Sequence, residues 1–151
     1  MDRIDRSILR ELQRDGRISI TDLAERVRLT PSPCLRRVRQ LERDGVIRGY
    51  RALLDTTAVS RAFQVFVTVV MAREDESSVA EFERRVAGMP EVVEAHRLFG
   101  DPDYLLRIAV ADVESYERLR TDRLLRLPGV AQLTSHVAMK AVKEDEGLAV
   151  D

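Results

Sequence analysis

The segment Thr30–Gly45 constrains the fold most, because it begins and ends as a helix does and contains four arginines. Thr30 can cap the first turn, and the two prolines that follow lie where backbone N–H groups lack partners within a helix. Gly45 is a usual helix stop. At about 100° per residue, three apolar residues fall on one narrow stripe. They are Cys34, Val38 and Leu41.

The opposite face of this predicted helix gathers hydroxyl, amide and guanidinium groups, which recognise base edges and phosphates. These residues are Ser32, Arg36, Arg39, Gln40 and Arg43, with Pro33 in the first turn and Arg37 on the flank. A helix of this kind is shaped to enter the major groove of DNA. Taken alone, the segment is also compatible with a solvated amphipathic helix.

Two shorter helical patterns upstream favour the DNA-binding interpretation. The first has apolar residues at helical spacing and ends at Gly16. The second opens at Ser19–Asp22, which has the pattern of a capping box, and its apolar residues are expected to face inward. A short turn then leads into Thr30, so the sequence predicts a helix-turn-helix with the arginine-rich helix second. The apolar residues of the two patterns are Ile4, Ile8, Leu9, Leu12, Leu23, Ala24 and Val27.

The segment Val46–Leu53 alternates and is interrupted by a glycine, as a small β-ribbon is. It predicts the wing of a winged helix. Arg51 on this wing and Arg43 near the end of the helix are expected to contact phosphates, whereas Ser32 and Arg36 should approach base edges.

Charge divides the chain near residue 52. Residues 1–52 contain 13 Arg and 8 Asp or Glu, whereas residues 53–151 contain 12 Lys or Arg and 18 Asp or Glu. The basic part should bind phosphate and the acidic part should not. We therefore expect a winged helix-turn-helix DNA-binding domain over 1–52, a linker over 53–61, a second domain over 62–142 and a frayed C-terminal tail over 143–151.

Residues 62–142 contain the same pattern twice: a β-rich run, a helix that opens on an aspartate, and a strand introduced by a proline. Two βαβ units predict βαββαβ, a ferredoxin-like antiparallel sheet with both helices on one face, so the fold class is α+β. The strands are expected at Ala62–Met71, Val93–Phe99, Tyr104–Ala111 and from Val130 to about Ala141, and the helices at Asp75–Arg84 and Asp112–Arg118.

The open face of such a sheet is best buried against a second copy, so we expect a homodimer. One set of residues on the first strand should face the helices, and the other should face the second copy. The two sets are Val65, Val67 and Val69, and Phe63, Phe66 and Val70.

Several classes of protein are excluded by what the sequence lacks. The only cysteine, Cys34, lies on an apolar stripe, and with His96 and His136 it offers no metal-ligand spacing. No catalytic motif is present, so we expect neither an enzyme nor a cofactor. There is no apolar run of about 18 residues, signal peptide or lipidation motif. We expect no membrane partner and a cytoplasmic, nucleoid-associated location.

Short motifs along nearly the whole chain are characteristic of one protein family. They are Asp2–Arg6, Asp15–Ile18, Pro31–Leu35 with Arg37 and Val38, Gly100–Leu106, and Leu127–Val130. In this order and spacing the chain resembles the leucine-responsive/asparagine-regulator (Lrp/AsnC) family of transcription regulators. The resemblance implies dimers that assemble further, often to octamers, and regulation by a small amino-acid ligand.

Gly100–Tyr104 is the candidate effector loop, although glycine and proline also make an ordinary turn here. In the family this loop lines a pocket at the contact between dimers. The resemblance assigns effector binding to Gly100, Asp101, Asp103 and Tyr104, with Pro102 at the position where the family varies; register adds Glu117, Thr121 and Thr134. We expect the loop to join the two central strands of the sheet.

Three functions are compatible with these observations. The first is a sequence-selective regulator that binds double-stranded DNA and responds to an amino acid. The second is an architectural protein that compacts DNA without effector control, and the third is an amino-acid-sensing subunit of an enzyme. The helix-turn-helix argues against the third, and Ser32, Arg36 and Gln40 on the groove-facing side argue against a purely architectural role.

Overall fold

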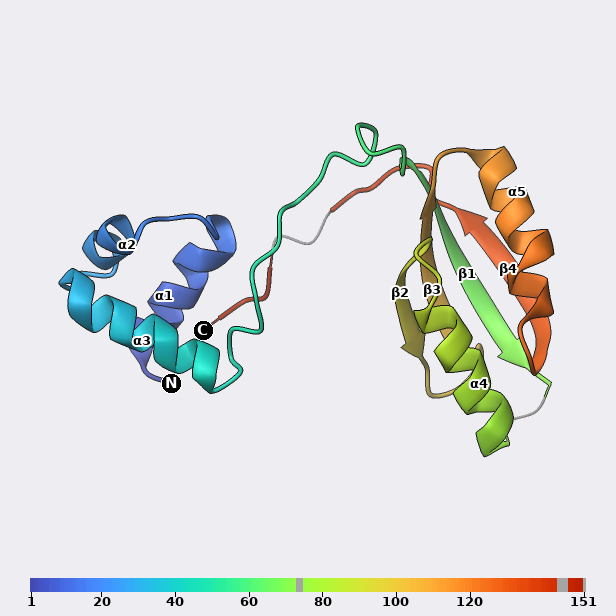
Figure 1. Cartoon of the computed structure of the whole chain (residues 1–151), viewed down its shortest axis with the longest axis horizontal. Coiled ribbons are helices and arrows are strands. Elements are labelled where there is room, and N and C mark those ends of the chain that lie inside the picture. Colours follow the sequence, from blue (N-terminus) through green and yellow to red (C-terminus); the bar gives the residue numbers. More distant parts are fainter. Residues whose placement is uncertain (73–74, 144–146, 151) are drawn as a thin grey trace. The chain divides into compact units, whose positions relative to one another are not determined.

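The computed structural model describes residues 1–72, 75–143 and 147–150 of the chain. These residues form two compact units (Figure 1). The first unit comprises Met1–Leu53 and the C-terminal segment from Val142, and the second comprises Leu54–Ala141.

The first unit consists of three helices: α1 (Arg3–Arg14), α2 (Ile20–Arg26) and α3 (Pro31–Arg43). α1 begins at Arg3 because the Asp2 carboxylate accepts the N–H groups of Ile4 and Asp5, while the Asp5 carboxylate accepts the N–H of Asp2. The three helices enclose one core that contains all the residues expected to face inward from α2 and α3. The predicted helix-turn-helix is therefore confirmed.

The predicted cap of α3 is not formed, although the helix begins where we expected. Thr30 is the N-cap residue, but its side chain makes no capping hydrogen bond. A cap side chain bonds the N–H of the second or third helical residue, and the third here is Pro33, which has none. The fixed φ of Pro31 at the first helical position remains to define the start.

The structure corrects our expectation of a β-ribbon at Val46–Leu53, because no residue from 44 to 60 lies in a strand. The chain instead folds back on α3: the Ile47 N–H donates to the Leu41 carbonyl at 3.0 Å, and the Tyr50 hydroxyl donates to Glu42 at 3.0 Å. Gly49 has φ +154°, which interrupts an extended run. A ribbon without a third strand or a supporting helix is also marginal in water.

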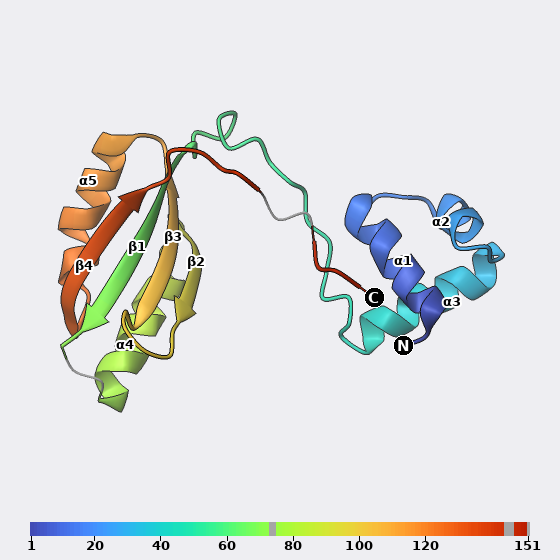
Figure 2. The ribbon, with the colours of Figure 1, turned by 180° about the vertical axis from the view of Figure 1, so that it is seen from behind.

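The second unit has the predicted βαββαβ order. Its elements are β1 (Phe63–Met71), α4 (Glu76–Ala87), β2 (Val92–Arg97), β3 (Tyr104–Val110), α5 (Val113–Asp122), the 3₁₀ turn η1 (Leu124–Arg126) and β4 (Val130–Val137). The sheet order is β2-β3-β1-β4, with every pair antiparallel. Figures 1 and 2 view the sheet from its two sides and show both helices on the same side. The α+β, ferredoxin-like prediction is confirmed.

The core of the second unit lies between the sheet and the two helices. Val65, Val67 and Val69 are fully buried there, so they are the helix-facing set of β1. Phe66 lies on the open face and is 37% exposed. Phe63 corrects our grouping: it is three positions from Phe66, so the two side chains face opposite sides of the strand, and its ring lies 6.4 Å from that of Tyr116 on the helix side.

The C-terminal residues 147–150 are not frayed, which corrects our expectation for this part of the tail. The Gln13 side chain on α1 donates to the Leu148 carbonyl at 3.0 Å and accepts the Leu148 N–H at 2.6 Å. The Arg10 guanidinium donates to the Val150 carbonyl at 2.9 Å. These bonds satisfy backbone groups of a segment with few apolar contacts, and the sequence contains no local sign of them. Residues 144–146 and 151 of the predicted tail lie outside the described residues.

Candidate functional site

The exposed face of α3 presents the groups expected to bind DNA. Its back is anchored in the core by Cys34, Val38 and Leu41, and burial raises the pKa of the Cys34 thiol. The predicted DNA-facing residues that are exposed are Ser32, Arg36, Arg39, Gln40 and Arg43, while Pro33 is half-buried.

Two of these arginines, Arg36 and Arg39, have no hydrogen-bond or ion-pair partner among the described residues. Gln40 does have partners: its amide donates to Asp44 at 2.6 Å and accepts from Arg43 at 2.6 Å. These exposed bonds can exchange for bonds to a base or phosphate. The face therefore offers two unengaged cations beside a polar network.

Arg37 differs from the other arginines of α3, because its guanidinium lies against the first turn of α1. It donates to Asp2 at 2.7 Å and to Asp5 at 2.8 Å. Hydrogen bonding to both carboxylates raises the pKa of Arg37, and the N–H of Asp5 together with Arg37 lowers the pKa of Asp2. Arg37 thus ties α3 to α1. Nothing in the sequence near Arg37 indicates these partners, which lie 35 and 32 residues away.

Arg51 is exposed and lies in the segment after α3 that forms no strand. It follows Tyr50, whose pKa rises to about 12 because burial and the Glu42 carboxylate both disfavour the phenolate. Arg51 is therefore placed beside a tyrosine that is held against the end of α3.

The loop Gly100–Tyr104 lies between β2 and β3. Because β2 is an edge strand, the loop joins an edge strand to a central one, and our expectation of two central strands was wrong. Gly100 has φ +112°, a conformation that side-chain-bearing residues rarely adopt. Asp101 is exposed, and Pro102 and Asp103 are half-buried.

Asp103 fastens this loop to the end of β1. Its carboxylate accepts the Met71 N–H at 2.6 Å, and its own N–H donates to the Val69 carbonyl at 3.0 Å. Its carbonyl accepts the Leu98 N–H at 2.7 Å, which closes the hairpin. One carboxylate oxygen of Asp103 therefore already accepts a hydrogen bond within the fold.

Tyr104 points away from the loop and into the helix side of the sheet. Its hydroxyl donates to Glu83 on α4 at 2.8 Å, and its ring lies 4.6 Å from that of Phe82. Burial and Glu83 raise the pKa of Tyr104 to about 12. Nothing in the local sequence indicates that Glu83 is a partner, because the two residues are 21 positions apart.

The remaining effector candidates lie on two different sides of the sheet. Glu117 and Thr121 are exposed on α5. Thr134 pairs with Thr68 and points to the open face, since the next residue, Ser135, contacts the Tyr116 hydroxyl on the helix side. The sheet therefore separates Thr134 from the two α5 residues.

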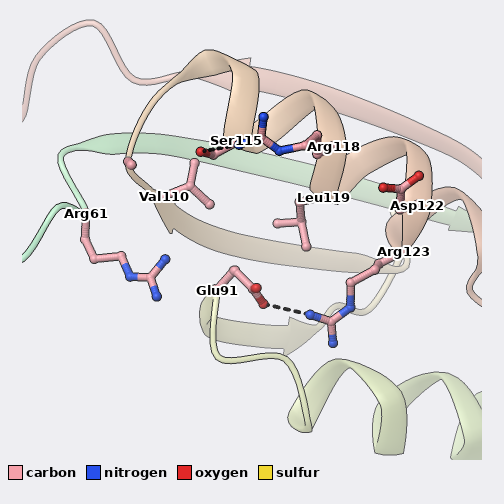
Figure 3. A pocket seen from close by; sticks show the side chains of 9 residues that line it. Arg61, Glu91, Val110, Ser115, Arg118, Leu119, Asp122 and Arg123 are labelled. Atoms are coloured by element: carbon pink, nitrogen blue, oxygen red, sulfur yellow. Dashed lines mark hydrogen bonds and ion pairs between the residues drawn. The ribbon is translucent and has the colours of Figure 1, made fainter.

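A cleft of the second unit lies elsewhere (Figure 3). It has a volume of about 340 Å³ and contains the Glu91–Arg123 ion pair at 3.0 Å. It is lined by Arg61, Glu91, Val110, Ala111, Ser115, Arg118, Leu119, Asp122 and Arg123. It adjoins the last residue of β3, whereas the loop precedes the first, so about 20 Å of strand separates them. None of the candidate effector residues lines this cleft.

A smaller cavity of about 250 Å³ adjoins the loop through Tyr104. It lies between α4 and β2, and its lining is Phe82, Glu83, Val86, Ala87, Ala95, Arg97 and Tyr104. Across residues 1–72, 75–143 and 147–150, no three His, Cys, Asp or Glu side chains are grouped so as to hold a metal ion. In the same residues, no helix is long and apolar enough to cross a membrane.

Models of known families match both units of the chain. A winged helix-turn-helix DNA-binding model matches residues 1–48, and the Lrp/AsnC ligand binding domain matches residues 64–148. The leucine-responsive regulatory protein of Escherichia coli is 45% identical over 150 residues, which are 99% of this chain and 92% of that protein.

Solved structures are similar over nearly the full length. An AsnC family transcriptional regulator from Agrobacterium tumefaciens has a TM-score of 0.94 and 39% identity, covering 99% of this chain and 97% of that chain. A transcriptional regulator from Neisseria meningitidis, solved in complex with L-Met, has a TM-score of 0.91 and 38% identity, covering 95% and 93%.

Proposed function

The chain belongs to the Lrp/AsnC family, and we propose that it reads DNA with helix α3 and binds its amino-acid effector at the loop Gly100–Tyr104. Members of this family are transcription regulators and not enzymes. The protein is accordingly an effector-responsive, DNA-binding transcription regulator. What we propose is the identity of the residues that perform each part.

The exposed face of α3 is the observation that most supports the DNA-binding assignment. Arg36 and Arg39 project from a helix whose back is fixed in the core, and they have no partner among the described residues. Two unengaged guanidinium groups on a rigid helix are suited to guanine edges and phosphates. We assign base reading to Ser32 and Arg36. Phosphate contacts are assigned to Arg39, Arg43 and Arg51. Gln40 can contact either a base or a phosphate, and Pro33 is assigned to packing against the sugar-phosphate backbone of the DNA.

Arg37 has a different part in this proposal. Both of its carboxylate partners are on α1, so it positions α3 rather than contacting DNA. Residues 1–52 then form the DNA-binding domain, 53–61 the linker, 62–142 the effector and assembly domain, and 143–151 the C-terminal tail.

The effector is a free amino acid, the class to which L-Met in the similar Neisseria meningitidis structure belongs. We propose that Asp101 and the second oxygen of Asp103 attract its ammonium group, while N–H groups of the loop bind its carboxylate. We propose that Glu117, Thr121 and Thr134 contribute from a second copy, because the sheet separates Thr134 from the two α5 residues.

The open face of the sheet supports a homodimer. Phe66 is exposed there, and Val70 and Leu105 are only half-buried on the same face. A second copy that covers this face adds core to a small unit. We propose further assembly of such dimers, up to an octamer, and a cytoplasmic, nucleoid-associated location.

Two measurements test the proposed function. Thermal shift with the standard amino acids should identify one that raises the melting temperature by mass action. Duplexes selected by the protein from a random pool should contain inverted half-sites, and the amino acid should change their affinity. Equal binding of all duplexes, with no response to any amino acid, would instead indicate an architectural protein.

A further inference from the structure

The C-terminal segment 147–150 is bound to α1 through its backbone. The amide of the Gln13 side chain donates to the Leu148 carbonyl and accepts the Leu148 N–H, so it pairs with this residue as a neighbouring strand would. Arg10, on the same face of α1, donates to the Val150 carbonyl. The Leu148 side chain itself is 81% exposed. Arg10 and Gln13 therefore hold an extended backbone, and we call this docked segment the clip.

Gly147 shows how closely the docked backbone approaches α1. A Cβ at this position would overlap the side-chain oxygen of Gln13, and the φ of +101° is one that other residues rarely adopt. Glycine fits here for both reasons. A larger residue would therefore release the clip, and because Gly147 belongs to neither hydrophobic core, it would do so without disturbing either core.

The clip leaves the DNA-facing side of α3 uncovered. The side chains that hold it, Arg10 and Gln13, belong to α1, whereas Ser32, Arg36 and Arg39 of α3 are exposed. The docked segment therefore does not compete with DNA for these side chains, which argues against an autoinhibitory role.

The clip completes a second connection between the two units. The chain leaves the first unit after Leu53 and returns to it at Val142 (Figure 1). One connection thus runs from Leu53 to the start of β1, and the other runs from the end of β4 to Leu148. Each contains about ten residues, so its reach is limited to about 35 Å. While the clip is docked, every displacement of the first unit must satisfy both limits at once.

We propose that the clip acts as a strap that narrows the range of DNA half-site spacings to which a dimer of the chain can bind. Two DNA-binding domains that are each held by one flexible linker can reach half-sites over a broad range of separations. A second connection of similar length removes part of that range and raises the effective concentration of the second domain within the rest. The inference rests on the proposed function, because it requires a homodimer that binds inverted half-sites.

Two substitutions in the full chain release the clip by different means. Gln13→Ala removes both hydrogen bonds to Leu148, and Gly147→Val introduces the overlap with Gln13. Leu148→Ala is the matched control, since it removes an exposed side chain and keeps the backbone groups that Gln13 binds. Hydrogen exchange on the scale of seconds should be faster at residues 147–150 in both release variants and unchanged in the control.

DNA binding measures the consequence of releasing the clip. The duplexes carry two half-sites selected by the protein, with the spacer at its selected length or changed by about five base pairs, which is half a helical turn. The unmodified chain and the control should strongly prefer the selected spacing. The release variants should lose about 10-fold of that preference, while their affinity for a single half-site stays unchanged.

The proposal is overturned if residues 147–150 of the unmodified chain exchange as fast as an unstructured peptide, if the release variants keep the full spacing preference, or if Leu148→Ala loses it as they do. Weaker binding of a single half-site by the release variants would also overturn it, because the effect would then lie within the DNA-binding domain. Failure of the proposed function is distinguishable. The unmodified chain would then prefer no duplex at any spacing and the strap would fall with it, whereas hydrogen exchange would still show whether the segment docks.

Discussion

The two units of this chain form their functional surfaces in different ways. In the first unit, the exposed face of α3 comes from one helix of 13 consecutive residues, so its polar groups gather by helical period alone. In the second, the candidate effector residues lie on a hairpin, on α5 and on the open face of the sheet. We infer that the DNA-binding surface is complete in one chain, whereas the effector surface requires a second copy.

The two surfaces also differ in how far their side chains are already engaged. Arg36 and Arg39 have no partner among the described residues, so DNA can bind them without breaking bonds of the fold. Asp103 and Tyr104 both have hydrogen-bond partners within the second unit. Substitutions on α3 should therefore change binding alone, and substitutions at the hairpin should change binding and stability together.

The largest expected effect tests whether the units are independent. Phe82→Ala removes a fully buried ring of the second unit and should destabilise that unit by about 3–5 kcal/mol. Hydrogen exchange should show lost protection in β1 and β3 and unchanged protection in α1 and α2. Phe99→Ala, at an exposed phenylalanine, should change stability by less than about 0.5 kcal/mol. Equal loss of protection in both units would contradict their independence.

The next effect separates binding from stability at the hairpin. Asp103→Asn keeps an oxygen that can accept the Met71 N–H but removes the charge, so amino-acid affinity should fall by about 10- to 100-fold. Asp103→Ala should also destabilise the second unit by about 1–3 kcal/mol, because the Met71 N–H loses its partner. Calorimetry and urea unfolding measure the two quantities. Normal amino-acid binding by the Asn variant would remove Asp103 from the site.

A third prediction concerns Arg36. Arg36→Ala should cost about 1–3 kcal/mol on a selected duplex and much less on a random one, because a base contact is lost. Fluorescence anisotropy at several salt concentrations measures both affinities. An equal loss on both duplexes would show that Arg36 contacts phosphate instead.

Arg37→Ala is the matched control for this prediction. Its guanidinium bonds Asp2 and Asp5, so the melting temperature of the first unit should be lower in the variant. The slope of log DNA affinity against log salt concentration should stay unchanged. A slope reduced by about one unit would mean that Arg37 contacts a phosphate, and its assignment as a residue that only positions α3 would then be wrong.

The smallest expected effect is a pH dependence of the stability of the first turn of α4. Asp75 caps this helix, and hydrogen bonds from Ser77 and Ser78 lower its pKa from 3.8 to about 2. A carboxyl group whose pKa is lower in the folded than in the unfolded state stabilises the fold when the pH is above the unfolded-state pKa. The contribution of Asp75 should therefore be lost as the pH falls from about 4 to about 2. Hydrogen exchange of the first turn of α4 should follow that window. Asp75→Asn, which keeps the cap without titrating, should abolish the dependence.

Short-range pattern accounted for most of the secondary structure. The helical spacing of Cys34, Val38 and Leu41 and the aspartates at the start of α4 and α5 predicted helices that the structure contains. These features concern residues within a few positions of each other, and at that range backbone geometry determines which side chains share a face. The order βαββαβ followed from the repeated pattern, although its last strand ends at Val137 rather than near Ala141.

Pairing between distant residues was decided by the tertiary structure. Nothing in the sequence near Arg37 indicates that it bonds Asp2, and nothing near Gln13 indicates that it bonds Leu148. The edge position of β2 depends on strand order, whereas the helix-side position of Phe63 follows from the two-residue period of β1, which our grouping misassigned. Local period determines which residues share a face, but only the packing of all elements determines what that face meets, because each long-range contact depends on every other.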